Sequence, residues 1–350
     1  MLFTLIYAFP LFIEDRESEA FELASLYICY AFALQGLIHL TGYFYPPFGE
    51  FMVSIKRYEM QSMLMDDSHT VIINFRGYAL TGSLFFELPA AYGLAFLMFI
   101  RLQLIENQQY LTGFKAYAVS LLMFIGIMLS GRTGFVGVAV GILLYFIFIP
   151  DPIVIFMDLL KKAALVIPVM LFVYFVLLTP AQQEGLQENV FPFAFESFYN
   201  VSEGKEFRTA STDATLSFYF PLDDRTLVVG AGADVWSGGT SYRHTDAGYM
   251  RTIIYGGIPF LIIMLIYQYL YFAIPIALAI AYNTKKEKIA FWCFLLSFVY
   301  ILVLHIKDTA LGTLQGIETM YLFLGATFII QSYHKQKPVP ETDTADIGFF

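Results

Sequence analysis

Charged residues are scarce in this chain. Asp, Glu, Lys and Arg make up 14% of the 350 residues, whereas 58% are hydrophobic and 18% are aromatic. The mean hydropathy is +0.65. A water-soluble protein of this length has too little interior to bury so much apolar surface. The composition therefore excludes an ordinary soluble globular domain and indicates a protein that lies in a lipid bilayer.

Cysteines and basic runs are also nearly absent. Cys29 and Cys293 each lie inside an apolar segment, so nothing supports a disulfide framework or a Cys/His metal site. The 20 basic residues form no run long enough to follow a phosphate backbone, which makes nucleic acid an unexpected partner. The polar stretches hold no metal-ligand pattern and no nucleotide-binding glycine loop. We therefore expect neither a metal nor another cofactor.

The start of the chain lacks the pattern of a cleavable signal peptide. Residues 1–13 are apolar but have no basic start, and Glu-Asp-Arg-Glu-Ser-Glu follows at 14–19 instead of a small-residue cleavage site. We expect this segment to stay on the protein. It is short for a full membrane span.

Apolar segments recur along the whole chain without an internal repeat. They lie near residues 1–13, 21–41, 84–104, 114–130, 134–149, 163–180, 256–281, 289–305 and 317–331. About 20 helical residues cross a bilayer, so most of these segments qualify as spans. The sequence predicts an all-α polytopic membrane protein of about nine transmembrane helices, with residues 1–350 forming a single transmembrane domain.

Lysines and arginines near the segment ends predict the orientation. The connection at 283–288 holds three lysines and is the clearest cytoplasmic signal. Alternating helices then place Lys161, Arg101 and the tail at 332–350 on the same cytoplasmic side. The predicted outer connections are residues 42–83, the turn at 130–133, the large loop at 181–251 and the link at 306–316.

The large loop is too long for a simple connector, so we expect it to be folded. Residues 191–198 combine aromatic side chains with an acidic one, as in a helix that lies on a membrane surface. Residues 215–220 indicate a short helix or strand, and residues 227–232 a buried segment.

The loop ends in a polar stretch at residues 241–251 that contains Arg243, His244, Asp246 and Arg251. Thr245 or Asp246 is a good N-cap for a helix that begins near Ala247. The positive end of that helix faces outward, where an anion can bind. The alternative is that Asp246 only caps the helix, while Arg243 and His244 are solvated loop residues.

Two further arginines lie at the predicted outer face. Arg132 occupies the Ser-Gly-Arg-Thr-Gly turn at 130–134, and Arg76 follows Asn-Phe at 74–75. Small neighbours let an anionic group approach the guanidinium and the backbone together. The alternative for Arg132 is a snorkelling side chain that ends a hairpin. His305, Lys307 and Asp308 give a weaker signal, because Lys307 and Asp308 are able to pair with each other.

In order and spacing, these motifs resemble the Wzy-type O-antigen polymerases, which share a superfamily of membrane glycosyltransferases with the O-antigen ligases. The motifs are Arg76-Gly77 before a helix, the Ser-Gly-Arg-Thr-Gly turn, and a late outer loop that ends in Arg-His-Thr-Asp-Ala-Gly-Tyr. The resemblance covers roughly residues 70–330. The chain has fewer helices before Arg76 than that family has.

The resemblance implies a metal-independent glycosyltransferase of the GT-C type in the bacterial inner membrane. Its substrate would be an undecaprenyl-diphosphate-linked oligosaccharide, polymerised at the periplasmic face, and a chain-length regulator protein would be a possible partner. His244 would act as the base, and Asp246 would orient it or cap the helix. Arg76 and Arg132 would bind the diphosphate, with Arg243 and Arg251 as additional contacts. The alternatives are an O-antigen ligase and, in a different class, a lipid-linked sugar flippase or transporter.

Overall fold

The computed structural model describes the membrane core and much of the large loop. The described residues are 16–54, 87–105, 110–149, 151, 153, 168, 171, 173–204, 209–232, 245–282, 284–308 and 315–336. Within these ranges all regular structure is helical and no strand occurs. The prediction of an all-α protein is confirmed at this level.

Five helices are long and apolar enough to cross a membrane. They are α2 (Ala20–Phe44), α6 (Glu87–Leu104), α7 (Gly113–Ser130), α15 (Gly248–Tyr282) and α16 (Lys285–Leu304). The shorter α8 (Thr133–Phe148) is also apolar, and α17 (Gln315–Gln336) completes the bundle. The structure thus supports a multi-pass membrane protein. Nine spans remain a prediction, since residues 1–13 and 163–167 lie outside the described ranges.

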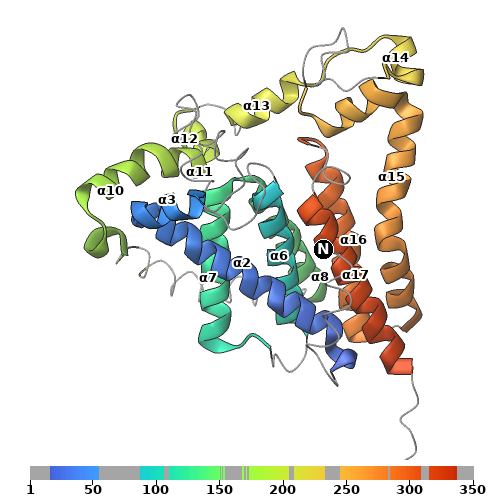
Figure 1. Ribbon diagram of the computed structural model, residues 1–350, viewed down its shortest axis with the longest axis horizontal. Helices are drawn as coiled ribbons and strands as arrows, with labels where there is room; N and C mark the ends of the chain where they lie inside the picture. Colours follow the sequence, from blue (N-terminus) through green and yellow to red (C-terminus); the bar gives the residue numbers. More distant parts are fainter. Residues whose placement is uncertain are drawn as a thin grey trace, which may run out of the picture.

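The large loop forms a chain of short helices. After η3 (Val173–Leu177) come α10 (Pro180–Gly185), η4 (Leu186–Val190), α11 (Phe191–Ala194), α12 (Glu196–Ser202), α13 (Ala210–Ser217) and α14 (Asp224–Val229). Figure 1 shows α10 to α14 as a band over the end of the bundle at which α7 ends and α8 begins. The loop is therefore folded, as predicted. The expected burial of residues 227–232 is wrong, because Val228 and Val229 are 63% and 67% exposed.

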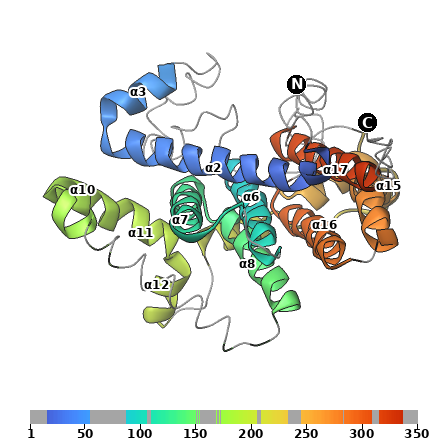
Figure 2. The same cartoon turned by 90° about the horizontal axis from the view of Figure 1, so that it is seen from below.

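In the amino-terminal half, the long helix α2 lies between two short helices. The 3-10 helix η1 (Glu17–Glu19) leads directly into α2, and α3 (Pro46–Ser54) follows α2 after a single residue. Figure 2 shows α2 lying across α6 and α7. The packing of α2 against both helices makes it one wall of the core.

Helix α6 is the centre of the core, and glycines let its neighbours approach closely. A Cβ atom on Gly137 of α8 would lie 2.3 Å from the Cα of Gly93 of α6. A Cβ on Gly126 of α7 would lie 2.3 Å from the ring of Tyr92. In a bilayer, helices associate through such small residues because lipid is as apolar as their side chains. These contacts hold α7 and α8 against α6.

Helix α15 is broken near its amino-terminal end at Gly256 and Gly257. Gly257 has φ +73°, a left-handed conformation that suits glycine. Pro259 has no N–H to donate to the carbonyl of Tyr255. The backbone N–H of Gly232 donates to that carbonyl instead, at 3.0 Å, and the N–H of Ala231 donates to the carbonyl of Ile254 at 2.6 Å. The segment after α14 therefore satisfies the backbone groups that the break frees.

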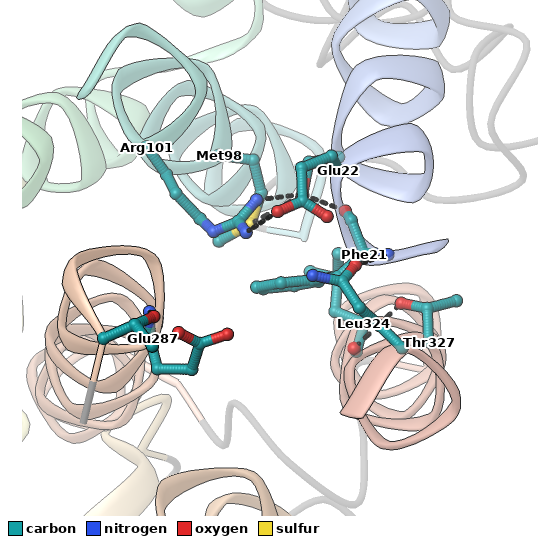
Figure 3. Close-up of polar contacts among 10 residues, drawn as sticks. Phe21, Glu22, Met98, Arg101, Glu287, Leu324 and Thr327 are labelled. Atoms are coloured by element: carbon teal, nitrogen blue, oxygen red, sulfur yellow. Dashed lines mark hydrogen bonds and ion pairs between the residues drawn. The ribbon is translucent and has the colours of Figure 1, made fainter. Parts of the chain in front are cut away.

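Arg101 is buried inside the bundle, a property that the sequence did not predict. Its side chain is only 1% exposed and lies between α2, α6, α16 and α17 (Figure 3). The guanidinium donates to Glu22 at 3.4 Å and to the hydroxyl of Ser25 at 3.3 Å. It also lies 3.7 Å from the ring centroid of Phe21. An arginine can be buried there because a carboxylate, a hydroxyl and an aromatic face replace water.

Arg101 and Glu22 make a stability prediction. Arg101→Met leaves the Glu22 carboxylate buried without its counter-charge, so we expect a loss of about 3–5 kcal/mol in unfolding free energy. The double variant Arg101→Met/Glu22→Gln should recover most of this loss, because neither charge is then buried. Unfolding of the purified protein in detergent measures both. Equal stability of the single and double variants would contradict the assignment.

Candidate functional site

Arg132 lies at the tight turn between α7 and α8. Gly131 ends α7 with φ +151°, and a Cβ on Gly134 would lie 2.9 Å from the carbonyl oxygen of Pro89. The two glycines therefore let the turn fold closely over the start of α6. The Arg132 guanidinium forms an ion pair with the carboxylate of Glu196, the first residue of α12.

The Arg132–Glu196 pair is accessible from outside. The two side chains are 21% and 25% exposed, in contrast to 1% each for Arg101 and Glu22. A guanidinium fork binds a carboxylate and a phosphate with the same donors. Arg132 is thus able to bind an anionic ligand that arrives from the surface.

Arg251 belongs to a second polar cluster. Its guanidinium donates to the carboxylate of Asp308 at 3.4 Å, with side-chain exposures of 20% and 29%. The sequence raised a Lys307–Asp308 pair as one possibility, and the structure gives Asp308 a contact with Arg251. The first segment of α15 reaches this connection because the backbone N–H of Tyr249 donates to the carbonyl of His305 at 3.3 Å.

His305 is buried beside this pair. Its Nδ1 lies 3.2 Å from the backbone carbonyl of Asp308, and its Nε2 contacts the side-chain amide nitrogen of Gln268. Burial lowers the pKa of the His305 imidazole from 6.5 to about 4. A neutral imidazole has one donor and one acceptor. We assign the Nδ1–H as donor to Asp308 and Nε2 as acceptor from Gln268.

The start of α15 is fixed by Thr245. Its buried hydroxyl donates to the carbonyl of Phe218 at 3.1 Å and accepts from the N–H of Ala247 at 3.2 Å. The helix begins at Gly248, close to the predicted start near Ala247. The Asp246 side chain is half-buried next to this cap. Its proposed role toward His244 stays a prediction.

The turn of Arg132 and helix α16, which precedes the second cluster, both contact the start of α6. The turn of Arg132 packs on Pro89 through Gly134. The hydroxyl of Tyr300, one turn before His305, donates to the carbonyl of Ala90 at 2.9 Å. The predicted outer turn at 130–133 and the start of the outer link at 306–308 are therefore neighbours of one helix end.

The structure describes only part of the predicted site. Arg132, Asp246 and Arg251 are described, whereas Arg76, Arg243 and His244 lie outside the described residues. Sequence reasoning missed Glu196 as the partner of Arg132 and undervalued His305 and Asp308. The available signal for the latter two was their position directly after a membrane-length segment.

No family model, curated protein or solved structure matches this chain. In the part of the chain that the structure describes, no three His, Cys, Asp or Glu side chains lie together as a potential metal site. The site must therefore be interpreted from its own side chains.

His305 gives a pH prediction. Its folded-state pKa of about 4 lies below the ordinary 6.5, so between these values the unfolded chain binds a proton that the folded chain does not. The stability contributed by burying the neutral ring is complete above pH 6.5 and is lost as the pH falls toward 4. We expect His305→Gln to have a flatter decline of the unfolding free energy between pH 6.5 and 4. Parallel declines in both proteins, measured by denaturant unfolding in detergent, would show that His305 does not titrate this way.

Proposed function

We propose that this protein is a metal-independent glycosyltransferase that polymerises undecaprenyl-diphosphate-linked oligosaccharide repeats at the outer face of the bacterial inner membrane. The growing chain moves from one lipid carrier to the non-reducing end of the next repeat, and undecaprenyl diphosphate is released. The proposal rests on the motif resemblance and on one structural observation. Arg132 lies at a turn that packs on the start of α6, and Arg251 pairs with Asp308 just after α16, a helix that also contacts the start of α6.

Arginines suit this reaction because the leaving group is a diphosphate. Negative charge grows on its oxygens as the glycosidic bond breaks, and preorganised donors stabilise that charge. Arg132 lies at the turn between α7 and α8, where its side chain is 21% exposed and pairs with Glu196 of the large loop. Arg251 lies in the first turn of α15 and pairs with Asp308. Arg76 and Arg243 stay predicted contacts.

The acceptor hydroxyl must lose a proton to a base. His244 is the proposed base, on the sequence pattern alone. His305 does not suit this role, because its side chain is 2% exposed and both ring nitrogens are engaged, with Gln268 and with Asp308. A base needs a free lone pair within reach of the substrate. The buried histidine is therefore a structural residue in this proposal.

An O-antigen ligase would use the same groups with a lipid A-core acceptor, so it remains the alternative within this class.

A lipid-linked sugar flippase is the alternative in a different class, and two specific observations support it. Arg101 and Glu22 form a charged pair inside the bundle, and α15 is broken at Gly256 and Gly257. Buried charges and broken helices are common in transporters.

The polymerase proposal is tested with purified protein in nanodiscs and lipid-linked repeats. Arg132→Ala should lower the elongation rate about 100-fold or more, since a single transition-state donor commonly has this effect. Arg132→Lys keeps the charge but loses the guanidinium fork, so an intermediate rate is expected. Equal unfolding midpoints control for folding. A product ladder of normal length from Arg132→Ala would refute the role of Arg132.

Three further arms separate the alternatives. A chelator should leave elongation unchanged. Glycan transfer to lipid A-core without elongation would identify a ligase. Movement of the lipid-linked repeat across proteoliposomes, with no new glycosidic bond, would identify a flippase.

A further inference from the structure

We propose that Glu196 is an internal competitor for the anion site on Arg132. Its carboxylate holds the guanidinium until a diphosphate-bearing lipid replaces it, and this exchange releases α12 from the turn between α7 and α8. The identity of the diphosphate rests on the proposed function. The exchange itself rests on the geometry of the Arg132–Glu196 contact.

The contact has the properties of an exchangeable pair. It joins residues 64 positions apart, one on the bundle and one on the loop. About a quarter of each side chain is exposed, so water screens the attraction and a ligand reaches the guanidinium without opening the core. The Arg101–Glu22 pair, exposed by only 1% on each side, has neither property.

The loop around Glu196 is able to follow such an exchange. Among the described elements, α10, η4, α11 and α12 pack mainly on one another rather than on the bundle. Phe195 and Tyr199, on either side of Glu196, are 37% and 49% exposed. Loss of the ion pair therefore removes a contact between the bundle and a segment that buries little surface of its own.

A diphosphate is a stronger competitor than other anions for this position. The guanidinium accepts a carboxylate or a phosphate in the same fork. A lipid diphosphate carries more negative charge than Glu196 and is delivered at the membrane boundary, where the Arg132 side chain is 21% exposed. The diphosphate of the substrate thus takes the place of the Glu196 carboxylate on the Arg132 guanidinium.

A role for Glu196 as the catalytic base does not fit the same geometry. In an inverting transfer the acceptor attacks the anomeric carbon from the side opposite the leaving group, so the base lies across the sugar ring from the diphosphate. Glu196 contacts the guanidinium that would bind the diphosphate itself. It therefore lies on the side of the leaving group.

The test measures binding of undecaprenyl diphosphate to the full chain in phosphatidylcholine nanodiscs. Glu196→Gln should bind roughly 2- to 5-fold more tightly, because the site is no longer partly occupied by its own carboxylate. The matched control is Glu188→Gln, which removes one exposed charge from η4 in the same loop and should leave the affinity unchanged. The gain should disappear in an Arg132→Ala background.

Glu196→Asp provides a second variant that keeps the charge. Its side chain is shorter by one methylene, so it should reach Arg132 less well and give a smaller gain in affinity. An unchanged or weaker affinity in both Glu196 variants, with unfolding midpoints like the wild type, would overturn the proposal and leave a purely structural tie.

Further arms identify the source of the anion. Inorganic pyrophosphate tests the diphosphate group without its lipid, and a gain there supports the proposal. A gain seen only with phosphatidylglycerol in the nanodisc would overturn the diphosphate assignment. Elongation is measured separately. If the wild type does not elongate but Glu196→Gln still gains affinity, the proposed function fails while the exchange stands, and the reverse result rejects the exchange alone.

Discussion

The close approach of helix backbones around α6 is the constraint on which the outer end of the molecule depends. Gly93 and Gly137 bring α6 and α8 into backbone contact, which no larger side chain would allow. The start of α6 then becomes a fixed point. Gly134 packs on it from one side, and the hydroxyl of Tyr300 bonds to it from the other. Because lipid gives helices no hydrophobic reason to associate, these small-residue contacts fix the position of the turn that carries Arg132.

The molecule uses ion pairs in two different physical settings. Arg101 and Glu22 are sealed between four helices, where separating the charges is strongly unfavourable. Arg132 and Glu196 lie at the boundary with water, where the attraction between the two charges is weak and the ion pair opens reversibly. The buried pair therefore contributes to the fold, whereas the accessible pair offers a place for exchange with a ligand.

The positions of the helices could be predicted from hydropathy, because the bilayer imposes a length of apolar sequence on each span. The start of α15 could also be predicted, since Thr245 and Ala247 act within one turn of each other. The side-chain pairings between helices could not be predicted from the sequence. Nothing local shows that Asp308 contacts Arg251, or that Arg101 turns inward to Glu22. Such contacts depend on which helix faces meet, and composition and spacing along one segment do not determine that.

The two halves of the large loop are attached to the bundle in different ways. The second half is held by backbone hydrogen bonds from Ala231 and Gly232 to the break in α15, and by the hydroxyl of Tyr219 on the carbonyl of Ile306. These bonds replace partners that a broken helix needs, so releasing them would leave buried backbone groups unsatisfied. The first half reaches Arg132 through a side-chain carboxylate that water or another anion is able to replace. If the loop moves on ligand binding, α10 to α12 should therefore move. Helix α14 and the start of α15 should stay in place and keep Arg251 and its neighbours in position.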